Sequence, residues 1–228
     1  MASPGPLLLD PSPALRPEPV TLTGRRVTLT PLDPRHSEAL YKRTHGEQRE
    51  QLWRYLPNGP FPGEAAFRSV MEQRSASRDP LYLSIIENAT GECTGWASFL
   101  RIEPAHRSIE VGSILFTPEL QRTPAATEAM YLMARHAFED LGYRRYEWKC
   151  DALNAPSRRA ALRLGFRPEG IFRQHMIIKG RNRDTAWFAM LDGEWPARKA
   201  NFERWLAPEN FDHSGEQKLS LSALNQAG

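Results

Sequence analysis

The spacing of hydrophobic and polar residues predicts alternating strands and helices along the first half of the chain. Strands are expected where polar and apolar residues alternate or β-branched residues gather, and helices where apolar residues recur every three or four positions. The segments are, in chain order, a strand at residues 26–32, helices at 34–44 and 63–77, and strands at 81–86 and 94–102. A turn containing Gly91 separates the last two strands, so we expect an antiparallel hairpin.

The centre of the chain has the pattern of a buried strand followed by a long helix. Residues 109–116 are apolar, β-branched or small, and Glu110 is the only charged residue among them. Apolar residues then recur on one helical face as far as residue 141, and Gly142 is expected to end the helix. Thr123 is a good N-cap, and Pro124 fits the first helical position because its missing N–H is not needed there.

The start of this central helix is a candidate anion site. We expect the backbone N–H groups of Ala125, Ala126 and Thr127 to be unpaired there and to point outward with the positive end of the helix dipole. Arg122 adds a full positive charge beside them. Such helix ends bind phosphate groups in many proteins, although most helix ends contact only water, and the pattern by itself leaves both interpretations open.

The second half of the chain repeats the strand and helix order. The expected elements are a strand at residues 145–151, a short helix at 155–164, a hairpin of strands at 171–178 and 185–191, and a helix at 195–206. Because a helix connects the strands at 109–116 and 145–151, these two strands are expected to be parallel. Asn154 is the expected N-cap of the short helix, and Ser157 lies on the apolar face of that helix.

The two ends of the chain differ from this pattern. Residues 1–22 contain six prolines and are expected to form a mostly extended arm. Residues 207–228 are mostly polar and are expected to form a poorly ordered tail. We therefore expect a single domain at residues 23–206.

Composition narrows the class of protein without naming a function. The chain of 228 residues is 40% hydrophobic and 25% charged, and its net charge of +3 comes from interspersed charges rather than from a basic block. This pattern argues against a nucleic-acid or membrane surface. Cys93 and Cys150 are too few for a disulfide framework or a zinc site, and neither a membrane span nor a signal peptide is evident. A cytoplasmic protein without a metal is expected.

The segment Gln121-Arg122-Thr123-Pro124-Ala125-Ala126 resembles the Gln/Arg-x-x-Gly-x-Gly/Ala pyrophosphate-binding motif of the GNAT acetyltransferase superfamily. Asn154-x-x-Ser157 and Leu164-Gly165-Phe166 resemble the branch of that family related to ribosomal-protein-alanine acetyltransferases. The resemblance covers roughly residues 25–191 and rests on the order of these motifs. Pro124 departs from the motif, because it stands where the family has its first glycine.

The resemblance implies an α+β (α/β/α) fold with helices on both faces of a mixed, mostly antiparallel sheet. The fourth and fifth strands of that sheet would be parallel and splayed around an acyl-CoA. Acetyl-CoA is the implied co-substrate. The residues that the resemblance places against it are Ile114, Leu115, Phe116, Gln121, Arg122, Thr123, Ala125, Ala126, Thr127, Asn154 and Ser157.

Acetyl transfer to an amine requires a base for the amine, a hydrogen bond for the polarised carbonyl oxygen, and a proton for the departing thiolate. The resemblance assigns these roles to Glu110, to the backbone N–H of Ile114 and to the hydroxyl of Ser157. Glu110 has an alternative role, as the partner of Arg101 or Arg107 in a purely structural ion pair. An extra residue in the strand before its turn also predicts a β-bulge near Ile114.

The acceptor is the least constrained part of the hypothesis. In the family, the loop at residues 52–62 borders the acceptor groove, so Trp53, Tyr55 and Phe61 are candidates for contacting the acceptor or a partner subunit, and His175 is a further candidate. Aromatic residues beside prolines also pack as small satellite cores, which is the alternative for these three. The acceptor would be a small-molecule amine or a protein N-terminus, and the sequence leaves a homodimer open.

Two further departures from the family support a competing hypothesis. Ala161 stands where most of the superfamily has a tyrosine acid, and Met176 stands where the ribosomal-protein branch has a glutamate. Together with Pro124, these residues are compatible with a catalytically silent protein that binds acyl-CoA or acts as a scaffold. Because Glu110 and Ser157 are both present, we favour an acyl-CoA-dependent N-acyltransferase that transfers the acetyl group directly within a ternary complex.

Overall fold

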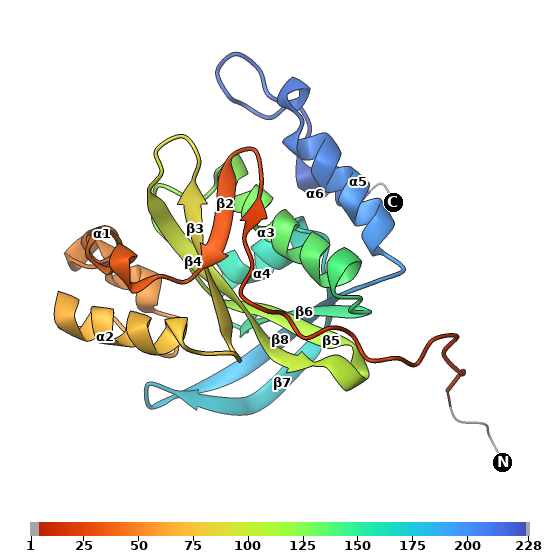
Figure 1. Ribbon diagram of the computed structural model, residues 1–228, viewed down its shortest axis with the longest axis horizontal. Coiled ribbons are helices and arrows are strands. Elements are labelled where there is room, and N and C mark those ends of the chain that lie inside the picture. Colours follow the sequence, from red (N-terminus) through yellow and green to blue (C-terminus); the bar gives the residue numbers. More distant parts are fainter. Residues whose placement is uncertain (1–4, 227–228) are drawn as a thin grey trace.

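The computed structural model describes residues 5–226, whose strands form one eight-stranded sheet with helices on both faces (Figure 1). Residues 1–4 of the predicted arm and 227–228 of the predicted tail lie outside the described residues. The strands are β1 (Leu22–Thr23), β2 (Val27–Pro31), β3 (Leu81–Glu87), β4 (Cys93–Glu103), β5 (Ser108–Phe116), β6 (Arg145–Asp151), β7 (Arg167–Ile178) and β8 (Arg181–Leu191). Their order in the sheet is β1-β2-β3-β4-β5-β6-β8-β7.

The helices divide between the two faces of the sheet. They are α1 (Ser37–Thr44), α2 (Glu64–Ser75), α3 (Pro124–Arg135), α4 (Ala155–Arg163), α5 (Trp195–Leu206) and α6 (Leu221–Gln226). Trp53, Phe67 and Trp96 belong to a smaller core beneath α1 and α2. The larger core lies between the sheet and α3 and α4, and α5 extends it by packing against α3 (Figure 1). The predicted α+β architecture is therefore confirmed. None of the helices within residues 5–226 has both the length and the apolar composition that crossing a membrane requires.

The helix and strand signals in the sequence are reproduced at the level of single hydrogen bonds. The Thr123 hydroxyl accepts from the backbone N–H of Ala126 at 3.1 Å, and Pro124 opens α3. Asn154 caps α4 in the same way, because its side-chain oxygen accepts from the N–H of Ser157 at 3.2 Å. Gly142 lies just after the helical segment that follows α3 and has a φ of 76°, a conformation that favours glycine.

The two parallel strands pair over only part of their length. Ser108 to Val111 of β5 pair with Arg145 to Trp148 of β6, and beyond that point β5 continues beside β4 while β6 continues beside β8. The two strands therefore diverge after the pair Val111 and Trp148. This confirms the predicted splayed pair of parallel strands. The pair was predicted as the fourth and fifth strands and is β5 and β6 in the structure, because the sequence pattern missed the two-residue strand β1.

The N-terminal arm is extended from residue 5 onward and is attached to the domain. The N–H of Ala14 donates to Pro104 O at 3.0 Å, and the N–H of Leu15 donates to Leu141 O at 2.9 Å. Ala14 and Pro17 are buried, whereas Leu7 and Leu9 are fully exposed. This part of the arm is therefore extended, as predicted. The two backbone hydrogen bonds of Ala14 and Leu15 attach it to the domain.

The expectation of a poorly ordered tail is wrong for residues 207–226. Leu221, the first residue of α6, is completely buried, and Asn225 accepts a hydrogen bond from Arg198 of α5 through its backbone oxygen at 2.9 Å. The Asn225 side chain also donates to Arg163 O of α4 at 2.9 Å. The tail packs because a few apolar side chains, Phe211, Leu221 and Leu224, and a few polar groups find partners in the core and on α4 and α5, which a mostly polar composition does not reveal.

A buried carboxylate joins the first turn of the sheet to α3. Glu128 is 5% exposed and accepts from the backbone N–H groups of Arg25 at 3.1 Å, Arg26 at 2.6 Å and Val27 at 2.9 Å. A Cβ atom on Gly24 would lie only 2.7 Å from the Glu128 carboxylate, so this close approach requires glycine. The contact fixes the β1–β2 turn against α3.

Candidate functional site

The candidate site lies where β5 and β6 diverge, and a bulge in β5 shapes one of its walls. The pairing of β4 with β5 shifts between Trp96 and Ser98, and Ser113 has a left-handed φ of 49°. The Trp96 indole N–H donates to Ser113 O at 2.9 Å, and the Ser98 hydroxyl donates to Gly112 O at 2.9 Å. These two side chains hold the bulge, which confirms the prediction of a bulge in this strand.

The bulge leaves Ser113 and Ile114 without partners in the strand register. Ile114 is half-buried beside the opening, whereas Leu115 is 2% exposed and belongs to the core beneath α1 and α2. Phe116 is half-buried and is the last residue of β5. The backbone of this short stretch therefore borders the gap, while the Leu115 side chain points away into the core.

The start of α3 has fewer free N–H groups than the sequence suggests. The N–H of Ala126 donates to the Thr123 hydroxyl, and the N–H of Thr127 donates to Thr123 O at 3.4 Å. The expectation of three unpaired amides is therefore wrong for two of them. Thr123 is the acceptor in both cases: its N-cap side chain accepts from Ala126, and its backbone oxygen accepts the first helical hydrogen bond, from Thr127. Within the described residues, the N–H groups of Ala125 and Arg122 have no protein acceptor.

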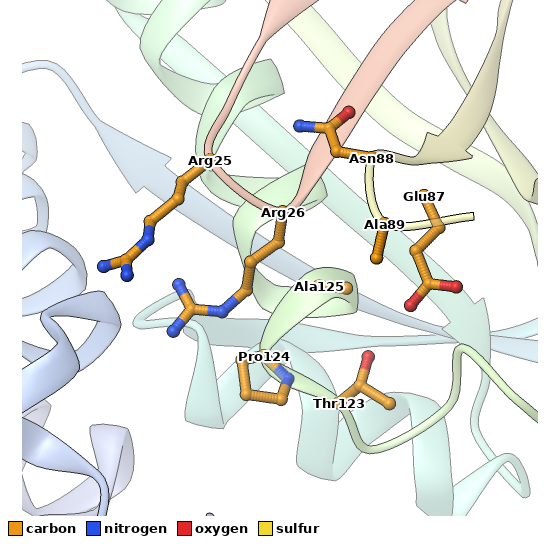
Figure 2. A pocket seen from close by; sticks show the side chains of 8 residues that line it. All are labelled: Arg25, Arg26, Glu87, Asn88, Ala89, Thr123, Pro124 and Ala125. Carbon is orange, nitrogen blue, oxygen red and sulfur yellow. The ribbon is translucent and has the colours of Figure 1, made fainter. Parts of the chain in front are cut away.

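A cavity of about 450 Å³ opens beside this helix start, as Figure 2 shows. It is lined by Arg25, Arg26, Glu87, Asn88, Ala89, Thr123, Pro124 and Ala125. The side chains of Arg25 and Arg26 extend in the same direction (Figure 2). Sequence reasoning assigned the local positive charge to Arg122 alone and missed these two arginines, because about 100 residues separate them from the helix.

Gln121 and Arg122 form the turn that leads into α3. The Gln121 side chain donates to Phe116 O at 3.1 Å and thereby links the end of β5 to the turn. Arg122 is exposed and has a φ of 62°, so its side chain is free to meet an anion approaching from solvent. Both residues therefore lie between the end of β5 and the start of α3, and their contact with a pyrophosphate stays a prediction.

Ser157 faces the sheet, as its position on α4 predicts. Its hydroxyl oxygen accepts from the indole N–H of Trp148 at 3.0 Å. Burial raises the pKa of the Cys150 thiol, and a hydrogen bond from Ser157 acts in the opposite direction. Ser157 is therefore held between two side chains of β6, at the end of the strand that turns away from β5.

Glu110 lies in a buried group of charged residues on the sheet face that α1 and α2 only partly cover. Its Oε2 atom is 2.9 Å from Arg101 Nε and 3.0 Å from Lys149 Nζ, although neither contact has the angles of a hydrogen bond. Arg101 is therefore a partner of Glu110, as the structural alternative proposed, whereas Arg107 instead donates to Gly142 O. Lys149 is a second partner that sequence reasoning missed.

The carboxylates of Glu110 and Glu147 have opposite pKa shifts. Burial raises the pKa of Glu110, and the charges of Lys149 and Arg101 offset only part of this effect. For Glu147, burial also acts to raise the pKa, but hydrogen bonds from Lys149 and Arg145 outweigh it and lower the pKa. A carboxylate with a raised pKa at the edge of the gap has the property expected of a general base.

The aromatic residues of the loop at 52–62 divide between core and surface. Trp53 is completely buried, and its indole N–H donates to Thr44 O at 2.8 Å, so a contact with an acceptor is excluded in this conformation. Phe61 packs edge-on against Trp53 with ring centroids 5.4 Å apart. Tyr55 is half-buried, and its hydroxyl donates to Leu153 O, between β6 and α4, at 3.1 Å. The satellite-core alternative is therefore right for Trp53, and Tyr55 remains a candidate.

His175 lies in the β7–β8 hairpin beside a second cavity of about 820 Å³, which is lined by Phe172, Arg173, Gln174, His175, Asn182 and Asp184. Its Nδ1 atom is 2.9 Å from the Thr185 hydroxyl. The His175 and Phe172 rings both pack near Trp187, with centroids 5.9 Å and 4.6 Å from it. Trp187 in turn lies beneath Lys149, so contacts connect this hairpin to the Glu110 group.

Comparison with known proteins matches residues 26–167 to the family model described as "Acetyltransferase (GNAT) domain". A crystal structure of a GCN5-related N-acetyltransferase from Brucella melitensis is 48% identical, with a TM-score of 0.92 over 94% of this chain and 98% of that one. YnaD of Bacillus subtilis, an uncharacterized N-acetyltransferase, is 25% identical over 76% of this chain and 98% of its own length. YdaF of the same organism, named "Putative ribosomal N-acetyltransferase", is 22% identical over 76% of this chain and 95% of its own length.

Proposed function

This chain belongs to the GNAT acetyltransferase family, and from that premise we propose that it transfers an acetyl group from acetyl-CoA to a primary amine. The observation that carries the proposal is the position of Glu110, a buried carboxylate with a raised pKa at the point where β5 and β6 diverge. A base at this point would lie next to the reacting acetyl group. The transfer would occur directly from donor to acceptor, without an acetyl-enzyme.

The residues around the gap fit the donor. The donor would lie between the splayed strands, in a slot that the backbone of Ile114 on β5 and Ser157 on α4 would border. The free N–H groups of Ala125 and Arg122, together with the exposed Arg122 side chain, would hold the pyrophosphate at the mouth of the slot. Acetyl-CoA, when bound, supplies an acetyl group activated as a thioester.

Each of the three catalytic tasks can then be assigned to a group of this chain. The backbone N–H of Ile114, a residue that the bulge leaves without a register partner, would donate to the carbonyl oxygen as negative charge develops on it. Glu110 would accept the proton of the acceptor amine. The Ser157 hydroxyl oxygen accepts from Trp148, and its proton, which otherwise faces the Cys150 thiol, would turn to the departing sulfur.

The acceptor proposed here is a small-molecule amine or a protein N-terminus. The relative YdaF supports the second possibility through its name alone. Measuring coenzyme A release from acetyl-CoA over a panel of amines and N-terminal peptides tests the proposal. Amine-dependent release would support it, whereas tight acetyl-CoA binding without release over the whole panel would favour the silent acyl-CoA-binding protein.

Ser157→Ala is expected to lower turnover about tenfold while leaving acetyl-CoA affinity unchanged. The loss should lie below the general range for acid–base catalysis of about 10²–10⁴, because a thiolate leaves readily without help. The variant also leaves the Trp148 indole N–H without its acceptor, which costs about 1 kcal/mol and lowers the melting temperature by about 2–4 °C. Steady-state kinetics and thermal unfolding measure the two effects.

Ser75→Ala is the matched control, because Ser75 is exposed at the end of α2 and its hydroxyl donates only to Glu72 O. It should change neither turnover nor affinity. Full activity of Ser157→Ala would show that water or another side chain protonates the thiolate.

Arg122→Glu is expected to weaken acetyl-CoA binding by about tenfold, because it replaces a phosphate-facing cation by an anion at the helix start. Added salt should weaken binding to the wild type more than binding to the variant. Calorimetry measures both, and Arg204→Glu, on the exposed surface of α5, is the control for the same change in net charge. Equal affinities of wild type and Arg122→Glu would place the pyrophosphate elsewhere, for example beside Arg25 and Arg26.

A further inference from the structure

Lys149 occupies a place that is built to bind an ammonium group. Its side chain is only 4% exposed, and Nζ lies 2.6 Å from Glu147 Oε2 and 3.0 Å from Glu110 Oε2. The same Nζ lies 3.7 Å from the centroid of the Trp187 ring. Two carboxylates and the face of an indole are the groups that recognise alkylammonium ions in proteins. We call Glu110, Glu147 and Trp187 the ammonium cradle.

Strand register places the cradle at the edge of the gap. Glu110 of β5 is aligned with Glu147 of β6 in the parallel pair, and Lys149 is aligned with Trp187 of β8 in the antiparallel pair. Residues two apart on a strand share a face, so Glu147 and Lys149 both lie on the face of Glu110. Lys149 is the first residue of β6 beyond its last pair with β5. The Lys149 ammonium group therefore lies beside Glu110, the proposed base.

The charges of the cradle are already balanced by the protein. Arg101 of β4 and Lys149 of β6 contact Glu110, while Lys149 and Arg145 of β6 contact Glu147 at 2.6 Å each. Arg145 is shared in turn with Glu169 of β7. No uncompensated carboxylate therefore remains there for a second cation, and the buried Lys149 ammonium would repel one at short range.

We propose that Lys149 is a specificity-determining residue that fills the ammonium cradle and thereby restricts the acceptor to weakly basic amines, which reach Glu110 uncharged. This inference rests on the proposed acetyl transfer. At pH 7 about one α-amino group in ten is uncharged, compared with about one alkylamine such as a lysine side chain in 2,500. A site that repels cations therefore favours the first class strongly.

The test compares two amines of similar shape, alaninamide and sec-butylamine, which differ in basicity. With wild-type protein at pH 7, kcat/KM should be at least tenfold higher for alaninamide, and raising the pH should benefit sec-butylamine more. Lys149→Met empties the cradle and leaves its carboxylates for an incoming ammonium. The ratio of kcat/KM for sec-butylamine to that for alaninamide should then rise by about tenfold or more, while Lys149→Arg, which keeps the charge, should retain the wild-type ratio.

Three results would overturn the inference. One is a wild-type preference for sec-butylamine at pH 7, a measurement that needs no variant and so decides the matter even where Lys149→Met does not fold. Another is an equal loss of both activities in a Lys149→Met protein that folds and binds coenzyme A normally, which would make Lys149 a positioning residue only. Activity toward alaninamide in these cases leaves the proposed function standing, whereas wild-type protein inactive on every amine overturns the proposed function and this inference with it.

Discussion

Glu110→Gln is expected to lower turnover by about 10²–10⁴-fold and to leave acetyl-CoA affinity nearly unchanged. The range is the general size of acid–base catalysis, and the affinity is unaffected because the base acts on the acceptor amine and not on the donor. Glutamine keeps the size of the side chain but can neither take up a proton nor carry the negative charge that faces Arg101 and Lys149. Single-turnover kinetics and calorimetry on the same preparations measure the two quantities.

The pH dependence gives this prediction a second readout. Glu110 works as a base only when ionised, so wild-type turnover should fall as the pH drops through its pKa. Burial raises that pKa above the ordinary 4.5, so the acidic limb should lie at a higher pH than for an exposed glutamate. The same shift means that Glu110 favours the folded state most when protonated, below its unfolded pKa, and that this contribution is lost as pH rises through the folded pKa.

Glu103→Gln, at the exposed end of β4, is the control for the loss of one carboxylate and should leave the profile unchanged. Unchanged turnover of Glu110→Gln together with a clear fall in melting temperature would contradict the catalytic assignment. Glu110 would then be the structural partner of Arg101 and Lys149, and the base would have to be sought elsewhere in the groove.

Glu128→Ala is expected to destabilise the fold by about 3 kcal/mol and to lower the melting temperature by about 6–12 °C. The wild-type carboxylate is buried and accepts three backbone N–H groups, from Arg25, Arg26 and Val27. Hydrogen bonds to a charged group contribute about 1.5–3 kcal/mol each at most, and their effects overlap within one turn. Chemical and thermal unfolding measure the change, and acetyl-CoA affinity should fall as well, because Arg25 and Arg26 line the cavity beside α3.

Glu38→Gln provides the comparison on the surface. Glu38 is exposed on α1 and pairs only with Lys42 four residues later, a kind of contact that contributes about 0.5 kcal/mol or less. A Glu128→Ala protein as stable as Glu38→Gln would show that water or a rearranged turn satisfies the three amides. The β1–β2 turn would then not depend on α3 for its position.

The sequence by itself determined the local elements and the family. Hydrophobic periodicity fixed β5, β6 and the start of α3 to within about a residue, because burial of one face depends on spacing along the chain. The predicted end of that helix at residue 141 was too late for α3, which ends at Arg135, and covers the separate helical segment His136–Asp140. The N-caps Thr123 and Asn154 were predictable because the side chain and the amide that it accepts from are three residues apart. The bulge near Ile114 was predictable for the same reason, since an extra residue is visible in the strand itself.

The tertiary structure alone decided what surrounds the candidate base and the helix start. Lys149 contacts Glu110 although 39 residues separate them in sequence, and Arg25 lies beside the start of α3 although about 100 residues separate the two. No local pattern in the sequence encodes either contact. Trp53 is buried and the tail packs because distant helices supply partners for a few side chains. Electrostatic and packing partners are set by which segments become neighbours in space, so the chemistry of Glu110 follows from the sheet order rather than from its place in the sequence.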